Sequence, residues 1–182
     1  LVALPTALIL LQPDLGSAAV VVAVGAVVVT VAGVPRRWVV AAVVLGVAVA
    51  VVALTTPVLS DYQRDRLTSF VDPSADPQGS GYQTRMVRLA IGAGGMWGQG
   101  FMRGERTQGG YVPYQLNDFV FSVAGEELGF VGATGLLLLL AFVVGRVLLV
   151  AARAQEPFGR LVAVGVATWL AVQVVQNVGM NL

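Results

Sequence analysis

The chain has 182 residues, of which 57% are apolar and only 12% are charged, and its mean hydropathy is +0.81. This balance is typical of an integral membrane protein, because a soluble domain carries about twice this share of charge. The absence of Cys and His excludes thiol nucleophiles, disulfides, histidine acid–base catalysis and the usual zinc sites. The net charge of +1 gives no overall basic field, so nucleic acid is not an expected partner.

Long apolar runs predict transmembrane helices along the chain. The expected spans are about 1–12 (partial), 16–34, 38–59, 129–150 and 161–182, with a loop at about 60–128. We therefore expect an all-α polytopic membrane protein, a transmembrane helix bundle in which residues 1–182 are part of a single membrane domain. Because the chain starts at Leu1 and ends within an apolar run, we expect an internal piece of a larger protein. Buried strands of a soluble α/β protein are the alternative interpretation of the Val- and Ala-rich runs.

Asp14 lies in the sequence LILLQPDLGSAAVVV, between the first two apolar runs. A carboxylate at mid-bilayer would cost about 2.5–3.5 kcal/mol, so its position needs a reason. Pro13 and Gly16 favour a break between two helices, and Asp14 can cap the second of them.

Arginine placement predicts the orientation of the chain. The short connections at 35–37 and 146–160 hold five arginines and one acid, which the positive-inside rule places in the cytoplasm. The loop at 60–128 is then extracytoplasmic, and Asp14 lies near the same outer face. A loop of this length exceeds what a simple connection needs, so we expect it to be functional.

The extracytoplasmic loop carries two features that suit anionic groups. Guanidinium forks bind phosphate and pyrophosphate well, so the arginine cluster predicts an anionic substrate group or contact with anionic lipid headgroups. The cluster comprises Arg64, Arg66, Arg85, Arg88, Arg103 and Arg106. The glycine-rich stretch GAGGMWGQG at 92–100 could cradle a phosphate, but it lacks the βαβ context of a nucleotide fingerprint. A flexible or closely packed loop is therefore the favoured interpretation.

Asp118 lies where the loop re-enters the apolar region and is the candidate general base. Acids at a membrane boundary are functional candidates, and partial desolvation would raise the pKa of Asp118 toward the range that a base needs. Asn117 and Asp118 are also good helix N-caps, so a capping role is the structural alternative. We expect Glu126 and Glu127 to support the site by pairing with loop arginines.

Short motifs in a fixed order carry a family resemblance. They are QPDLG (12–16), YQ-x-x-R (62–66), F-x-DP-x-x-DP-x-G-x-GYQ (70–83), AIG-x-GG-x-WG-x-G (90–100), VP (112–113), DF-x-F (118–121) and EELGFVG (126–132). In this order and spacing the chain resembles the SEDS (shape, elongation, division, sporulation) family, which includes RodA and FtsW. The resemblance covers nearly the whole chain and implies a fold of ten transmembrane helices, of which about the fourth to the eighth are present.

The resemblance implies a peptidoglycan glycosyltransferase that polymerises lipid II into glycan strands with inversion. It would act at the outer face of the bacterial cytoplasmic (inner) membrane, in cell elongation or division. The implied partners are lipid II, a class B penicillin-binding protein, other proteins of the elongation or division complex, and membrane lipids. No cofactor is assigned with certainty. A divalent cation, Mg or Mn, is the candidate cofactor, and its ligands are unknown.

The family's functional positions fall on particular residues of this chain. Its catalytic Asp falls on Asp118, and its cavity-associated Asp falls on Asp14. The residues expected to bind pyrophosphate or sugar are Arg66, Gln83, Arg85, Arg88 and Arg103. The pattern around Asp118 departs from the family at three positions. Tyr114 replaces the usual Glu, Leu116 replaces the usual His or Gln, and Asn117 replaces the usual Thr. A lipid II flippase or transporter and a non-catalytic scaffold of the cell-wall synthesis complex are the alternatives.

Overall fold

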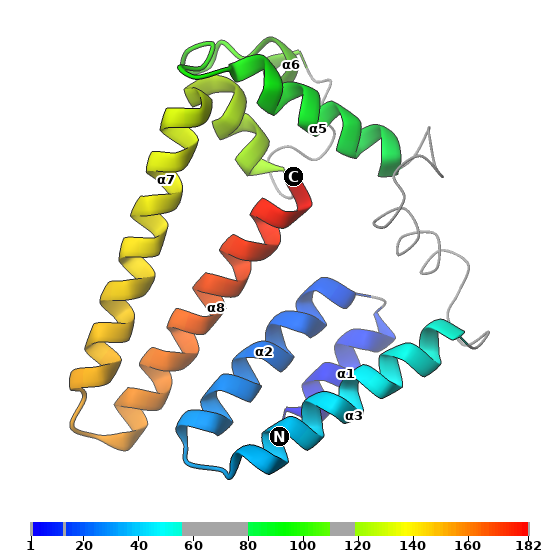
Figure 1. Cartoon of the computed structure of the whole chain (residues 1–182), viewed down its shortest axis with the longest axis vertical. Helices are drawn as coiled ribbons and strands as arrows, with labels where there is room; N and C mark the ends of the chain where they lie inside the picture. Colours follow the sequence, from blue (N-terminus) through cyan, green and yellow to red (C-terminus); the bar gives the residue numbers. More distant parts are fainter. Residues whose placement is uncertain (1, 13, 56–79, 110–118, 182) are drawn as a thin grey trace. The chain divides into compact units, whose positions relative to one another are not determined.

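The computed structural model describes residues 2–12, 14–55, 80–109 and 119–181, which form helices joined by turns (Figure 1). No strand occurs among these residues. The helices are α1 (Ala3–Leu11), α2 (Leu15–Val31), α3 (Arg36–Thr55), α5 (Ser80–Gly94), α6 (Glu105–Gln108), α7 (Val120–Arg153) and α8 (Pro157–Asn181). The all-α class is thereby confirmed for the described part of the chain.

Among the described residues, two helices are long and apolar enough to cross a membrane. α7 has 34 residues and α8 has 25, whereas a span needs roughly 20. Many of their large apolar side chains are exposed, and Phe142 is 64% exposed. A helix that is apolar on all sides and yet exposed is suited to lipid rather than to water. Shorter apolar stretches, Gly16–Val31 and Arg37–Gly46, lie within α2 and α3.

The structure divides into two compact units, and the first comprises Leu1–Asp65 and Val143–Gln173. In this unit α1 packs closely against α2 at Gly25, where a Cβ would lie only 2.6 Å from a methyl group of Val2. A Cβ at Gly165 of α8 would lie in ordinary van der Waals contact with α2. Small residues thus bring both neighbouring helices up to α2, as is common between membrane helices.

Asp14 begins α2 as its N-cap residue. Its carboxylate accepts hydrogen bonds from the backbone N–H of Ser17 at 3.0 Å and from the Ser17 hydroxyl at 2.6 Å. One of the N–H groups that a helix start leaves unpaired is thereby satisfied. The prediction that Asp14 caps the second helix is confirmed.

The second unit comprises Arg66–Phe142 and Val174–Leu182. Its small apolar core consists of Val87 and Ala90 of α5 together with Phe119, which directly precedes α7. Val87 and Ala90 are three residues apart and therefore share one face of α5. α5 and α6 both lie within the segment expected to be a loop, so part of this segment is helical.

Candidate functional site

Two of the expected site residues, Asp118 and Arg66, lie outside the described residues. The same holds for Asn117, so the expectation of a cap at 117–118 is also outside them. α7 begins at Val120, and the carbonyl of Phe119 accepts bonds from the backbone N–H of Ser122 at 3.0 Å and from its hydroxyl at 2.7 Å. The residue that follows Asp118 is therefore fixed at the start of a helix.

The arginines of α5 lie apart from its packed face, whereas Gln83, four residues before Val87, lies on the same face as the core residues. Gln83 is partly buried, whereas Arg85 and Arg88 are exposed and lie one helical turn apart. In the segment after α5, Arg103 is exposed and Arg106 is partly buried. Three of these arginines, Arg85, Arg88 and Arg103, are therefore accessible to solvent or to a bound anion.

The regular helix of α7 is interrupted at Gly129, whose φ of 67° and ψ of −171° are not helical. The bend lies near the start of α7 in Figure 1. An interruption removes backbone hydrogen bonds on both of its sides, and near a membrane these groups need other partners. The glycine-rich segment after α5 supplies them through four bonds, here called the helix-break exchange: Gln99 N–H to Glu126 O at 3.0 Å, Gly100 N–H to Glu127 O at 3.0 Å, Phe130 N–H to Gly95 O at 2.9 Å and Val131 N–H to Met96 O at 3.1 Å.

The helix-break exchange requires backbones to approach closely. A Cβ on Gly98 would overlap the carbonyl oxygen of Glu127, and one on Gly129 would overlap the backbone nitrogen of Gly98. A Cβ on Gly94 would likewise overlap the carbonyl oxygen of Gly125. The interpretation of the glycine-rich stretch as closely packed is confirmed. Because several of its N–H groups already bond to protein carbonyls, the stretch is not arranged as a phosphate cradle.

Glu126 of α7 is fully buried, and its side chain caps the start of α6. Its two carboxylate oxygens accept one hydrogen bond each, from the backbone N–H of Arg106 at 2.9 Å and of Thr107 at 2.9 Å. The residue before α6 is Gly104, which has no side chain to serve as a cap. N–H groups at a helix start favour a negative charge, so the buried carboxylate is compensated.

Glu127 holds the neighbouring turn in the same way. One carboxylate oxygen accepts from the backbone N–H of Met102 at 2.9 Å, and the other accepts from the side-chain amide of Gln108 at 3.0 Å. Met102 has a φ of 56°, which is uncommon for a residue other than glycine. Among the described residues, both glutamates therefore bond to N–H groups rather than to the arginine side chains that the sequence suggested.

Sequence reasoning did not single out Gln99, which joins the two ends of this segment. Its side-chain oxygen accepts from the backbone N–H of Glu105 at 2.9 Å, and its amide nitrogen donates to the Ala93 carbonyl at 3.4 Å. The available signal was one amide side chain within a run of glycines. Among the described residues, no group of three or more acidic side chains is placed to hold a metal ion.

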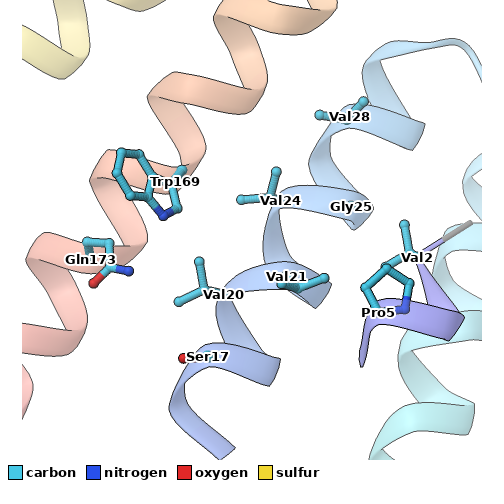
Figure 2. A pocket seen from close by; sticks show the side chains of 10 residues that line it. All are labelled: Val2, Pro5, Ser17, Val20, Val21, Val24, Gly25, Val28, Trp169 and Gln173. Carbon is cyan, nitrogen blue, oxygen red and sulfur yellow. The ribbon is translucent and has the colours of Figure 1, made fainter. Parts of the chain in front are cut away.

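An apolar groove of about 540 Å³ opens in the first unit, lined by α1, α2 and α8 (Figure 2). Val20 and Val24 of α2 point toward Trp169 and Gln173 of α8 across this groove. Ser17 and Gln173 are its polar residues, and Ser17 is also bonded to the Asp14 carboxylate. The groove is therefore apolar along α2 and polar toward the start of that helix.

Comparison with known proteins gives a consistent result. The model of the FTSW_RODA_SPOVE family, described as "Cell cycle protein", matches residues 1–182. The chain is 40% identical to the peptidoglycan glycosyltransferase MrdB of Escherichia coli (strain K12), over 99% of the chain and 48% of that protein. It is 39% identical to a probable peptidoglycan glycosyltransferase FtsW of Thioalkalivibrio sulfidiphilus, over 96% of the chain and 44% of that protein.

A third relative is named for sporulation. The chain is 36% identical to stage V sporulation protein E of Bacillus subtilis (strain 168), over 95% of the chain and 46% of that protein. The chain thus spans about half the length of the curated relatives that it matches.

Proposed function

The chain belongs to the FtsW/RodA/SpoVE family of cell cycle proteins, the SEDS family, and on this premise we propose that the protein is a peptidoglycan glycosyltransferase. It is an integral membrane protein of α-helices. The observation that carries the proposal is the 40% identity to a peptidoglycan glycosyltransferase over 99% of the chain. The proposed reaction polymerises lipid II into glycan strands, in cell elongation or division.

In the proposed mechanism, Asp118 removes the proton from the 4-hydroxyl of the acceptor sugar. The resulting oxygen nucleophile attacks the anomeric carbon of the donor and forms the new glycosidic bond. The bond from that carbon to the pyrophosphate oxygen breaks, and its electron pair leaves with polyprenyl pyrophosphate. Attack on the opposite face inverts the configuration, so an α-linked donor gives a β-linked glycan.

The arginines of the second unit are proposed to stabilise the charge that grows on the leaving pyrophosphate. Arg85, Arg88 and Arg103 are exposed and therefore accessible to such a group. Gln83 and Arg66 join this set through the family resemblance alone. A divalent cation, Mg or Mn, would offset the same pyrophosphate charge.

The groove between α1, α2 and α8 suits the hydrocarbon part of such a substrate. Its wall along Val20, Val24 and Val28 is apolar, whereas Ser17 and Gln173 offer polar groups. A chain of isoprene units has no hydrogen-bonding atoms and therefore suits this apolar wall. We propose that Asp14 supports the site through a basic partner in addition to capping α2.

Glu126 and Glu127 are proposed as positioning residues. They fix α6 and the turn at Met102 to the first part of α7, which begins two residues after Asp118 in the chain. Their carboxylates would act on catalysis by holding these elements rather than by touching substrate.

The proposed location is the bacterial cytoplasmic membrane, with the segment at 60–128 on the outer side. Five arginines in the connections at 35–37 and 146–160 support this orientation through the positive-inside rule. A class B penicillin-binding protein and other elongation or division proteins are the proposed partners.

The decisive test uses the purified whole protein with fluorescent lipid II in proteoliposomes. Glycan chains should form with the parent, form at an undiminished rate with Glu156→Gln, and be lost by about two orders of magnitude or more with Asp118→Asn. Undiminished polymerisation by Asp118→Asn would exclude this residue as the base. Transfer of lipid II across the bilayer without chains would favour a flippase, and neither activity would favour a scaffold.

A further inference from the structure

The segment between α5 and α6 exposes large apolar side chains. Met96 is 59% exposed, Trp97 81%, Phe101 76% and Met102 66%. We call these four residues the loop tip. Two aromatic rings and two thioether chains facing water within one short turn would be unfavourable, so the loop tip indicates a surface that is covered in the native environment.

The loop tip is fixed relative to the start of the apolar part of α7. The carbonyls of Gly95 and Met96 accept the backbone N–H groups of Phe130 and Val131, and the other two bonds of the helix-break exchange act just before Gly129. The backbone that carries the tip is therefore held to this part of α7.

The sequence of α7 locates the edge of the hydrocarbon layer close to the same point. No charged residue occurs from Leu128 to Gly145, whereas Glu126 and Glu127 lie just before this run and Arg146 just after it. An apolar run of this length matches the hydrocarbon thickness, so its first residues lie near one edge of the layer. Phe130 and Val131 are also exposed, which is the condition of lipid-facing side chains.

We propose that the loop tip inserts into the membrane interface, in the leaflet that surrounds the start of the apolar run of α7 at Leu128. Trp97 would lie at the level of the lipid glycerol groups, because an indole combines an apolar ring with one N–H donor. Phe101, Met96 and Met102 would contact the upper acyl chains, and the exposed Arg103 places a cation at the level of anionic headgroups. The tip thereby continues the lipid-facing surface of α7.

Bilayer lipid is the occupant that the structure favours over a protein partner. The tip lies beside Phe130 and Val131, which lipid already surrounds if α7 spans the bilayer. A soluble partner on the tip would have to exclude lipid from this adjoining surface as well. The tip also has an anchoring residue type, Trp, that is enriched at membrane interfaces.

Depth-dependent fluorescence quenching tests this proposal on the whole protein in nanodiscs. Subtracting the emission of Trp97→Phe from that of the parent isolates the Trp97 signal, whatever other tryptophans are present. Lipids brominated near the glycerol end should quench this signal more strongly than lipids brominated near the chain terminus, and aqueous iodide should quench it weakly. The matched control repeats the subtraction in a protein that carries Phe101→Tyr, both with Trp97 and with Trp97→Phe. This substitution keeps an aromatic ring at the tip.

Two results would overturn the proposal. Strong quenching by iodide without quenching by brominated lipid would place Trp97 in water. Protection from both quenchers would place it against protein, which includes a bound partner or a second copy of the chain. The measurement needs no lipid II, so its outcome is independent of whether the protein polymerises glycan.

Discussion

Gly98 and Gly129 lie in direct backbone contact, because a Cβ on Gly129 would overlap the backbone nitrogen of Gly98. Both residues also have positive φ, 79° and 67° respectively. Two independent constraints, close approach and left-handed backbone, therefore select glycine at each position. This contact lies at the centre of the helix-break exchange, and the stability of the second unit should depend on it.

Gly129→Ala and Gly98→Ala should each destabilise the protein by at least about 1–2 kcal/mol. A side chain at positive φ costs about this much, and the overlap adds to it. Thermal unfolding of the purified protein in detergent would measure the loss, together with faster proteolysis between residues 95 and 104. Gly135→Ala is the matched control, since a Cβ there meets nothing within 4 Å and alanine favours a helix. Equal melting temperatures for the three variants would contradict the close contact.

Glu126→Gln should destabilise α6 by about 1–3 kcal/mol. The amide oxygen can keep one of the two N–H bonds, but the amide nitrogen would face the other buried N–H, which then lacks an acceptor. Hydrogen exchange at Arg106 and Thr107 should accelerate markedly. Glu105→Gln makes the same chemical change at an exposed position of the same helix and should leave exchange nearly unaltered. Similar exchange in both variants would mean that the Glu126 carboxylate does not cap α6.

Substitutions at Asp14 can separate its cap from its charge. Asp14→Ala removes the acceptor for the Ser17 N–H and should cost about 1 kcal/mol of stability, whereas Asp14→Asn retains a good cap. If the charge also supports the site, Asp14→Asn should keep its melting temperature and lose glycan polymerisation. Parent-like polymerisation by Asp14→Asn would reduce the role of this residue to capping.

Arg85→Gln and Arg88→Gln should each weaken lipid II binding about two- to fivefold. This range corresponds to the roughly 0.5–1 kcal/mol that an exposed ionic contact contributes. The effect should appear in KM and should diminish as salt concentration rises. Arg160→Gln, an exposed arginine in the other unit, is the control and should leave KM unchanged. A salt-independent loss equal in all three variants would argue against a pyrophosphate site on α5.

The cap at Asp14 illustrates how much local sequence can predict. Proline, aspartate and glycine within four residues determine a helix start through backbone preferences that act over short distances, and the cap was predicted correctly. The all-α class and the apolar character of α7 and α8 follow from composition and length alone. None of these inferences requires knowledge of which segments meet in space.

Glu126 and Glu127 illustrate the limit of the same reasoning. Their charge suggested arginine partners, but the groups that lacked acceptors were backbone N–H groups of α6 and of the turn at Met102. Such a need becomes visible only when the two segments are brought together. The interruption of α7 was hidden for the same reason, since Gly129 opens an apolar run that reads as the start of a span. The role of Asp118 stays a prediction.

The helix-break exchange has a consequence for synthesis and inheritance. A ribosome delivers Gly95–Gly100 before the residues at 126–131 that complete their hydrogen bonds, so the glycine-rich segment cannot reach its final structure until the break in α7 has been translated. The two stretches should therefore be replaced together when sequences of homologues are combined. A chimera that takes the first stretch from one relative and the second from another must preserve the glycines of the contact, or the contact between the two stretches is destabilised.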